Sequence, residues 1–271
     1  MLGWLRKRQT PKARVDARPR RSMSGRKALA EPVPASMPAG CLVYAIGDIH
    51  GRADLLQAMM DKITEDAGDR AAESSLILLG DYVDRGEGSR EVIDYCLDHV
   101  AAWPGETVFL KGNHEDALLS FLTNPTEGDA WLGYGGLATL MSYGVGNVRE
   151  HMSAQELGVA AEEFSGKLPP EHLRFLTSLQ HFHQVGNYFF CHAGIDPMTV
   201  LDRQVPHVLM WGTGQEDLDL SDMPVTVVHG HYVHDRPEYF PNRIAIDTGA
   251  YFSSRLTAIR LEQGRVDFLN T

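Results

Sequence analysis

Apolar and polar positions follow two different periods in the first part of the chain. Residues 42–46 form a continuous β-prone apolar run, and residues 53–63 carry apolar side chains at helical spacing. The same order, a strand and then a helix, returns at 76–79 with 89–100 and at 107–110 with 115–122. Strands and helices that alternate at this spacing predict an α/β fold with a parallel or mixed sheet.

The second part of the chain changes its pattern. Residues 127–178 are expected to be mostly helical, with interruptions at glycines, and to form a cap beside the functional site. Strands are then expected at 181–185, 188–192, 225–229, 244–247, 256–261 and 265–269. Gly186-Asn187 is a hairpin signal between the first two of these strands. No internal repeat is visible, so we predict one domain over residues 39–271.

Composition narrows the class of protein. With 271 residues, of which 43% are hydrophobic, the chain can bury a full core. Its three cysteines, Cys41, Cys96 and Cys191, are too few and too widely spaced for a disulfide framework, which favours a reducing, cytoplasmic location. No window approaches the roughly 20 apolar residues of a spanning helix, so no membrane span is expected.

Charge is distributed unevenly. Residues 1–38 hold 10 Lys/Arg and 2 Asp/Glu, whereas the rest of the chain holds 15 and 34. Such a basic tail without apolar periodicity is expected to be disordered. It is either a docking arm for an acidic partner, nucleic acid or anionic lipid, or else a solvated extension or the product of a misassigned start codon. The acidic body makes nucleic acid an unsuitable main ligand, because phosphate contacts dominate that affinity.

Polar side chains of one chemical kind follow the predicted strands. Open α/β sheets bind ligands at the carboxyl ends of their strands, so these residues are expected to converge. Carboxylate, imidazole and amide donors together suit a pair of divalent cations. The candidates are Asp48, His50, Asp81, Asn113, His192 and His231.

Five ordered motifs carry a family resemblance. They are Gly-Asp-Ile-His-Gly at 47–51, Gly-Asp-Tyr-Val-Asp-Arg-Gly at 80–86, Gly-Asn-His-Glu at 112–115, Cys-His-Ala-Gly at 191–194 and Gly-His at 230–231. Over residues 41–262 the chain resembles the calcineurin-like metallophosphoesterases, and in particular the bacterial and phage phosphoprotein phosphatases that act on serine and threonine. The resemblance implies two mixed β-sheets packed as a sandwich and flanked by helices.

The resemblance also implies how the metals are held. Asp48 and His50 would bind the first metal, Asp81 would bridge both, and the second would be bound by Asn113, His192 and His231. A hydroxide shared by the two ions would attack phosphorus. Manganese is the first choice of metal, and iron, zinc, nickel and cobalt accept the same donors.

The resemblance also implies which residues carry out catalysis and bind the substrate. By resemblance His114 is the general acid for the leaving group and Asp84 orients its ring. Arg85 would bind two phosphate oxygens with its planar guanidinium. Asn113 is expected to contact the substrate as well as the metal.

The sequence leaves three assignments open: one metal ligand, the second phosphate-binding arginine and the role of the segment 131–136. His229 is the substitute if His231 is not the ligand. Family members carry a second phosphate-binding arginine shortly after a tryptophan, but none follows Trp211. Either Arg255 or Arg236 replaces it, or the phosphate is bound more weakly in the ground state. The segment 131–136 either roofs the site or packs within the cap.

The predicted function is hydrolysis of phosphomonoesters, with phosphoproteins or small phosphoesters as substrates and a serine/threonine protein phosphatase as the first reading. The alternative is a diadenosine tetraphosphate hydrolase or another nucleotide phosphoesterase, a related group that typically has Gln where His50 stands. The remote alternative is an inactive binding module.

Overall fold

The computed structural model describes residues 36–214, 219–240 and 242–271. The expectations for the tail, disorder and docking of an acidic partner, concern residues that lie almost entirely outside these ranges. Cys41, Cys96 and Cys191 are free thiols, as the cysteine spacing predicts.

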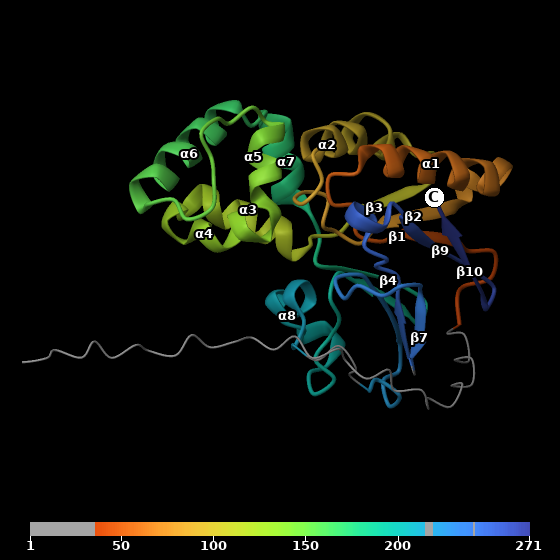
Figure 1. The fold of residues 1–271 in the computed structure, drawn as a ribbon. Helices are drawn as coiled ribbons and strands as arrows, with labels where there is room; N and C mark the ends of the chain where they lie inside the picture. Colours follow the sequence, from red (N-terminus) through yellow and green to blue (C-terminus); the bar gives the residue numbers. More distant parts are fainter. Residues whose placement is uncertain (1–35, 215–218, 241) are drawn as a thin grey trace, which may run out of the picture. The chain divides into compact units, whose positions relative to one another are not determined.

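The first sheet holds the strands of the opening repeats. Its order is β10-β9-β1-β2-β3, where β1, β2 and β3 are parallel and β9 and β10 are antiparallel to their neighbours. The strands are β1 (Leu42–Ile46), β2 (Ser74–Leu78), β3 (Glu106–Phe109), β9 (Thr257–Glu262) and β10 (Arg265–Asn270). Helices α1 (Ala53–Ala67) and α2 (Ser89–Asp98) lie over one face of this sheet (Figure 1).

The second sheet is built from the later strands, in the order β4-β5-β6-β8-β7. Its central strands β5, β6 and β8 are parallel, and β4 and β7 run antiparallel at the edges. The strands are β4 (Phe182–Val185), β5 (Tyr188–Cys191), β6 (Thr226–His229), β7 (Glu238–Phe240) and β8 (Arg243–Ala245).

The two sheets pack face to face because successive side chains of a strand point to opposite sides. In β1, Val43 and Ala45 join the core that contains Phe190 of β5, whereas Tyr44 and Ile46 join the core beneath α1. A strand buried on both faces needs a continuous apolar run, which is the pattern of residues 42–46. The predicted sandwich of two mixed sheets flanked by helices is confirmed.

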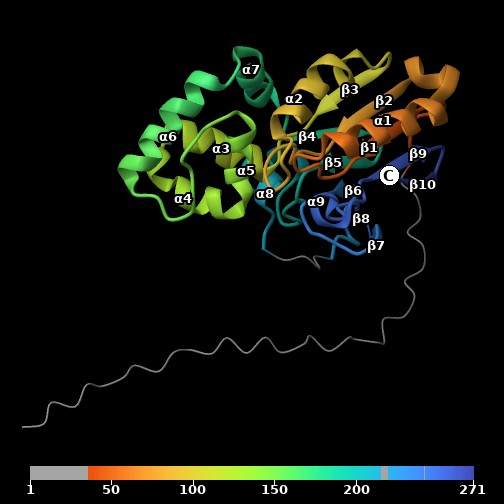
Figure 2. The same ribbon diagram turned by 45° about the horizontal axis from the view of Figure 1, so that its top comes forward.

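Residues 113–178 form a group of helices beside the sheets, as both ribbon views show (Figure 2). Within this group α5 and α7 contact α2. The helices are α3 (Asn113–Thr123), α4 (Gly128–Trp131), the π-helical turn η4 (Leu132–Gly136), α5 (Leu137–Ser142), α6 (Ala154–Lys167) and α7 (Pro170–Ser178). Short 3-10 turns are η1 (Gly68–Glu73), η2 (Val100–Ala102), η3 (Pro125–Glu127) and η5 (Leu201–Arg203).

Three short elements were not predicted. They are the edge strand β7 and the helices α8 (Pro206–Trp211) and α9 (Ala250–Ser253). None is long enough to span two full periods of apolar positions, so tertiary contacts and not local pattern determine them.

Candidate active site

The candidate residues converge at the carboxyl ends of parallel strands from both sheets. Asp81, which follows β2, lies between two groups of side chains that could hold a metal ion. One group is His50, Asp81 and His114, and the other is Asp81, His192 and His231. Gly112 leaves room for this arrangement, because a Cβ there would stand 2.0 Å from Asp81 Oδ1.

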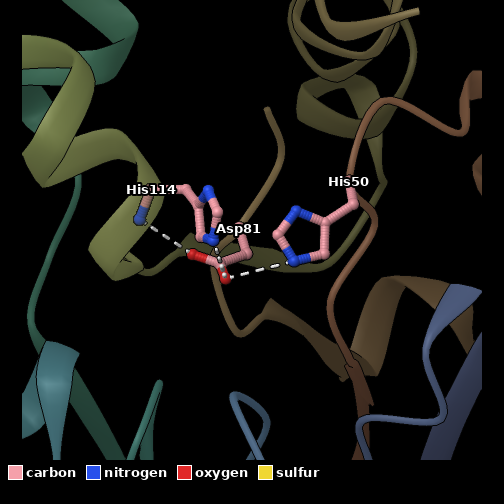
Figure 3. A group of neighbouring side chains, drawn as sticks. All are labelled: His50, Asp81 and His114. Carbon is pink, nitrogen blue, oxygen red and sulfur yellow. Dashed lines mark hydrogen bonds and ion pairs between the residues drawn. The ribbon is translucent and has the colours of Figure 1, made fainter. Parts of the chain in front are cut away.

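Asp81 presents a different oxygen to each group. Its Oδ2 lies 3.4 Å from His50 Nε2 and 3.8 Å from His114 Nε2, and Figure 3 shows the carboxylate between these two imidazoles. Its Oδ1 lies 3.4 Å from His192 Nε2. A carboxylate that faces two imidazole groups in this way is suited to bridge two cations.

The amide of Asn113 completes the second group. Its Oδ1 lies 3.0 Å from His192 Nε2 and 2.9 Å from His231 Nδ1. Asp48 lies on the other side of His231, whose backbone N–H donates to Asp48 Oδ2 at 3.0 Å. The structure therefore gathers all six predicted ligands, but it places His114 rather than Asp48 in the tight group around His50 and Asp81.

Backbone carbonyls fix the tautomers of two of the histidines. His50 Nδ1 lies 2.9 Å from Val83 O, and His192 Nδ1 lies 3.0 Å from Leu79 O. An Nδ1–H that donates to a carbonyl leaves Nε2 as a metal donor. In both residues that Nε2 faces a carboxylate oxygen of Asp81, an arrangement that needs a proton or a cation between the two atoms.

Burial sets the protonation of the site. It lowers the pKa of His50 and lowers that of His231 to about 3, so both rings are neutral. Burial also raises the pKa of Asp48, and the charges of Asp247 and Asp81 add to the effect. For Asp81 burial acts in the same direction, but His192 and His114 outweigh it and hold the pKa down. Buried carboxylates require counter-charges, so the residues present fit divalent metal ions, as the fold implies.

His114 and Asp84 form a second functional unit beside the ligands. His114 Nδ1 lies 2.6 Å from Asp84 Oδ2, and both side chains are buried. Burial lowers the pKa of His114, but Asp81 and the hydrogen bond to Asp84 outweigh it and raise the pKa to about 9. His114 is thus protonated at neutral pH, as a general acid must be.

Arg85 lies next to this pair. Its Nη2 is 3.3 Å from His114 Nε2, and its guanidinium carbon lies 4.9 Å from the centre of the Tyr251 ring. The backbone of Asp84 and Arg85 is left-handed, with φ of 74° and 69°, and His50, Asp81 and His231 share this unusual conformation. Strained backbone of this kind concentrates at functional sites.

The structure also bears on the open assignments. His229 is buried behind the cluster with its Nδ1 2.9 Å from Gly230 O, whereas His231 is within the cluster. Arg255 donates to the carbonyl of Asp235, and Arg236 is exposed. Arg243 was not among the arginines considered as the second phosphate-binding residue. It lines a small pocket together with Gly212 and Thr213, which directly follow Trp211.

Two further carboxylates at the site were missed. Glu115 is buried and accepts N–H groups from Asp81, Tyr82 and Gly112, which ties together the loops after β2 and β3. Asp247 is buried beside Asp48; its Oδ1 accepts the Gly249 N–H, but its Oδ2 has no hydrogen-bond partner among the described residues. Glu115 had a sequence signal in its place within the Gly-Asn-His-Glu motif, and Asp247 had one in its place at the end of the predicted strand 244–247.

Comparison with known proteins identifies the family of the chain. The sequence model of the calcineurin-like phosphoesterases matches residues 42–269. A bis(5'-nucleosyl)-tetraphosphatase PrpE [asymmetrical] of Bacillus thuringiensis (strain Al Hakam) is 26% identical over 233 residues, 79% of this chain and 88% of the relative. A second, from Bacillus velezensis, is 26% identical over 239 residues, 80% of this chain and 88% of the relative.

Solved structures share the fold. One provisionally named a diadenosine tetraphosphatase has a TM-score of 0.57 at 19% identity and covers 88% of this chain and 98% of its own. The cold-active protein-tyrosine phosphatase of a psychrophilic Shewanella has a TM-score of 0.55 at 16% identity, with coverages of 88% and 83%. A serine/threonine phosphatase of Saccharomyces cerevisiae has a TM-score of 0.53 at 15% identity, with coverages of 89% and 84%.

Within the described residues, no helix is long and apolar enough to cross a membrane.

The family match spans both sheets and every strand-end loop that carries the candidate ligands. The chain therefore belongs to the calcineurin-like phosphoesterases and is a hydrolase that acts on phosphoric ester bonds.

Proposed function

We propose that the protein is a metal-dependent phosphomonoesterase and that its substrates are proteins phosphorylated on serine or threonine. The observation that carries the proposal is the His114–Asp84 pair, with 2.6 Å between Nδ1 and Oδ2, next to the candidate metal ligands. A serine or threonine leaving group departs as an alkoxide, a strong base, so its departure needs a positioned proton donor.

Two divalent cations fit the donor set. Asp48, His50 and Asp81 would hold the first, and the second would be held by Asp81, Asn113, His192 and His231. When bound, such ions neutralise the phosphoryl oxygens and make a nucleophile available near neutral pH. Manganese is the first candidate, and iron, zinc, nickel and cobalt share the preference for these donors.

Arg85 and Asn113 would orient the phosphoryl group. The guanidinium of Arg85 lies beside His114 Nε2 and stacks on the exposed Tyr251 ring, which keeps its planar face in place. Two parallel N–H groups can then bind two phosphoryl oxygens. The amide N–H₂ of Asn113 can donate to a phosphoryl oxygen, because its carbonyl oxygen is the atom that faces His192 and His231.

His114 would protonate the leaving oxygen. Its Nδ1–H donates to Asp84, so the proton at Nε2 is the one available for transfer. Nε2 lies on the same side as Asp81 Oδ2 and Arg85 Nη2, where the phosphoryl group would bind. One ring thus reaches the substrate with one nitrogen while Asp84 holds the other.

The charges near the site favour a monoester over a polyphosphate chain. Arg85 is the guanidinium beside His114, whereas Arg52 is paired with Asp54 and Lys111 with Asp116. A tetraphosphate carries about twice the charge of a monoester and would need further cationic contacts along its length.

A second candidate function comes from the relatives. The Bacillus proteins with 26% identity are named bis(5'-nucleosyl)-tetraphosphatases, which makes asymmetric cleavage of a dinucleoside tetraphosphate the alternative substrate class. An inactive binding module is the remote third reading.

A substrate panel tests the proposal. The full chain, reconstituted with manganese, is assayed on phosphoserine, phosphothreonine and phosphotyrosine peptides, on p-nitrophenyl phosphate and on diadenosine tetraphosphate. We expect the phosphoserine and phosphothreonine peptides to give the highest kcat/KM. Cleavage of the dinucleotide alone would establish the alternative, and no turnover of any substrate would favour the binding module.

A further inference from the structure

The carboxylate of Asp84 receives three short hydrogen bonds from side chains. His114 Nδ1 and Trp131 Nε1 lie 2.6 Å and 2.7 Å from Oδ2, and Thr139 Oγ1 lies 2.6 Å from Oδ1. All four side chains are buried. Trp131 and Thr139 belong to the segment 128–142, which consists of α4, η4 and α5.

The same segment holds the backbone around Asp84. The Asp84 N–H donates to Thr139 Oγ1 at 2.9 Å, and the Arg85 N–H donates to Gly135 O at 3.2 Å. Both Asp84 and Arg85 have left-handed backbone, a strained conformation that persists only where surrounding contacts enforce it. The segment 128–142 thus fixes both the side chain and the main chain of this turn.

The local structure explains how the segment 128–142 reaches the Asp84 carboxylate, the Asp84 N–H and the Arg85 N–H. Gly135, with φ of 118°, breaks the helix inside η4 and directs its carbonyl at Arg85. The Trp131 ring packs against Phe121, with ring centres 4.9 Å apart, and against Gly136. Trp131 is therefore not available to stack on a substrate. Of the two roles left open for segment 131–136, a roof over the site and packing within the cap, the structure supports packing for Trp131.

We propose that Trp131 and Thr139 are positioning residues for the general acid: they lock the Asp84 carboxylate in the orientation that aims His114 Nε2 at the leaving oxygen. The inference rests on the proposed phosphomonoesterase function. A carboxylate bound by His114 alone could rotate about its last bond. The Trp131 and Thr139 donors occupy both oxygens and remove this freedom, so the imidazole is held in one direction.

This role makes a prediction that depends on the leaving group. Thr139→Val keeps the shape of the side chain and removes the donor, whereas Trp131→Phe keeps an aromatic ring but removes the donor together with part of the ring volume. Each should lower kcat for a phosphoserine peptide about 10- to 100-fold with little change in KM, because the acid acts only in the transition state. p-Nitrophenol leaves readily without a proton, so kcat for p-nitrophenyl phosphate should fall less than about 3-fold.

The matched control is Tyr143→Phe. It removes a hydrogen bond of similar burial from the same part of the chain, between Tyr143 OH and His172 Nδ1 at 2.8 Å, but this bond does not involve Asp84. Both substrates should be turned over at the wild-type rate. If Trp131→Phe and Thr139→Val lower kcat equally for both substrates, the two residues are merely structural and the inference is wrong.

A double-mutant cycle with His114→Gln gives an independent test. If Trp131 and Thr139 act through His114, their substitution in the His114→Gln background should lower kcat for the phosphoserine peptide by less than about 2-fold further. Additive losses would overturn the inference.

Failure of the proposed function would be recognised separately, because the wild-type chain would then turn over no monoester. In that case the imidazole protons of ¹⁵N-histidine-labelled protein decide the matter by NMR. The hydrogen-bonded Nδ1–H of His114 should give a low-field resonance in the wild type that shifts upfield or disappears in Trp131→Phe and Thr139→Val. An unchanged resonance in both variants would contradict the inference.

Discussion

Replacing Gly135 by alanine should damage both the stability and the site of the protein. Gly135 has φ of 118°, a conformation that L-residues rarely adopt, and a Cβ built on it would stand 2.7 Å from Arg85 N and 2.8 Å from Arg85 Cγ. The nearer of these two atoms belongs to the backbone, so a side-chain rotation cannot relieve the conflict. We therefore expect the turn that carries Arg85 to move.

The magnitude follows from two contributions. Forcing alanine into this backbone region costs about 1–3 kcal/mol. Overlap of the new methyl group with a fixed neighbour costs about 1–3 kcal/mol more. The sum, about 2–6 kcal/mol, is a large share of the ~5–15 kcal/mol that keeps a domain folded. At ~2–4 °C per kcal/mol, the midpoint of thermal unfolding should fall by at least about 4 °C.

The chain offers a matched control in the same π-helical turn. A Cβ added at Gly133 would meet no described atom within 4 Å, and the φ of Gly133 is not positive, so Gly133→Ala should leave the melting temperature unchanged or raise it slightly. Differential scanning calorimetry of both variants, with KM for a phosphoserine peptide as the second readout, makes the comparison. Equal melting temperatures for the two variants, or an unchanged KM in Gly135→Ala, would show that Gly135 does not hold the turn that carries Arg85.

Three further predictions concern the metals and the phosphoryl group. Asp247→Asn should weaken manganese binding about 10-fold in isothermal titration calorimetry, because it removes a charge beside Asp48; an unchanged Kd would contradict this role. Arg85→Lys should raise KM for a phosphoserine peptide about 10-fold, since an ammonium group binds one phosphate oxygen at a time; an equal KM would show that Arg85 does not bind phosphate. Removal of metal by a chelator should abolish turnover and lower the melting temperature, and added manganese should restore both; full activity after exhaustive dialysis would exclude a metal requirement.

The long, strongly patterned elements could be predicted from the sequence. The continuous apolar run at 42–46 and the helical spacing that follows it appear in the structure as β1 and α1. The short elements could not, because β7, α8 and α9 depend on contacts with distant parts of the chain.

The site divides in the same way. The ligands stand in short motifs after strands, so their convergence followed from the rule that parallel strands end at one edge of a sheet. Residues such as Trp131 and Thr139 have no comparable signal. Thr139 lies 55 positions from Asp84 along the chain, and its contact with that residue depends on a break in the helix at Gly135. Asp247 approaches Asp48 only because β8 and β1 belong to sheets that pack together.

The proposed mechanism requires Asp81 to be shared by two metal ions. Manganese binding to the wild type and to Asp81→Asn can be followed by isothermal titration calorimetry. We expect about two ions per wild-type chain and no more than about one, bound more weakly, in Asp81→Asn. If Asp81→Asn binds two ions with unchanged affinity, Asp81 does not bridge them.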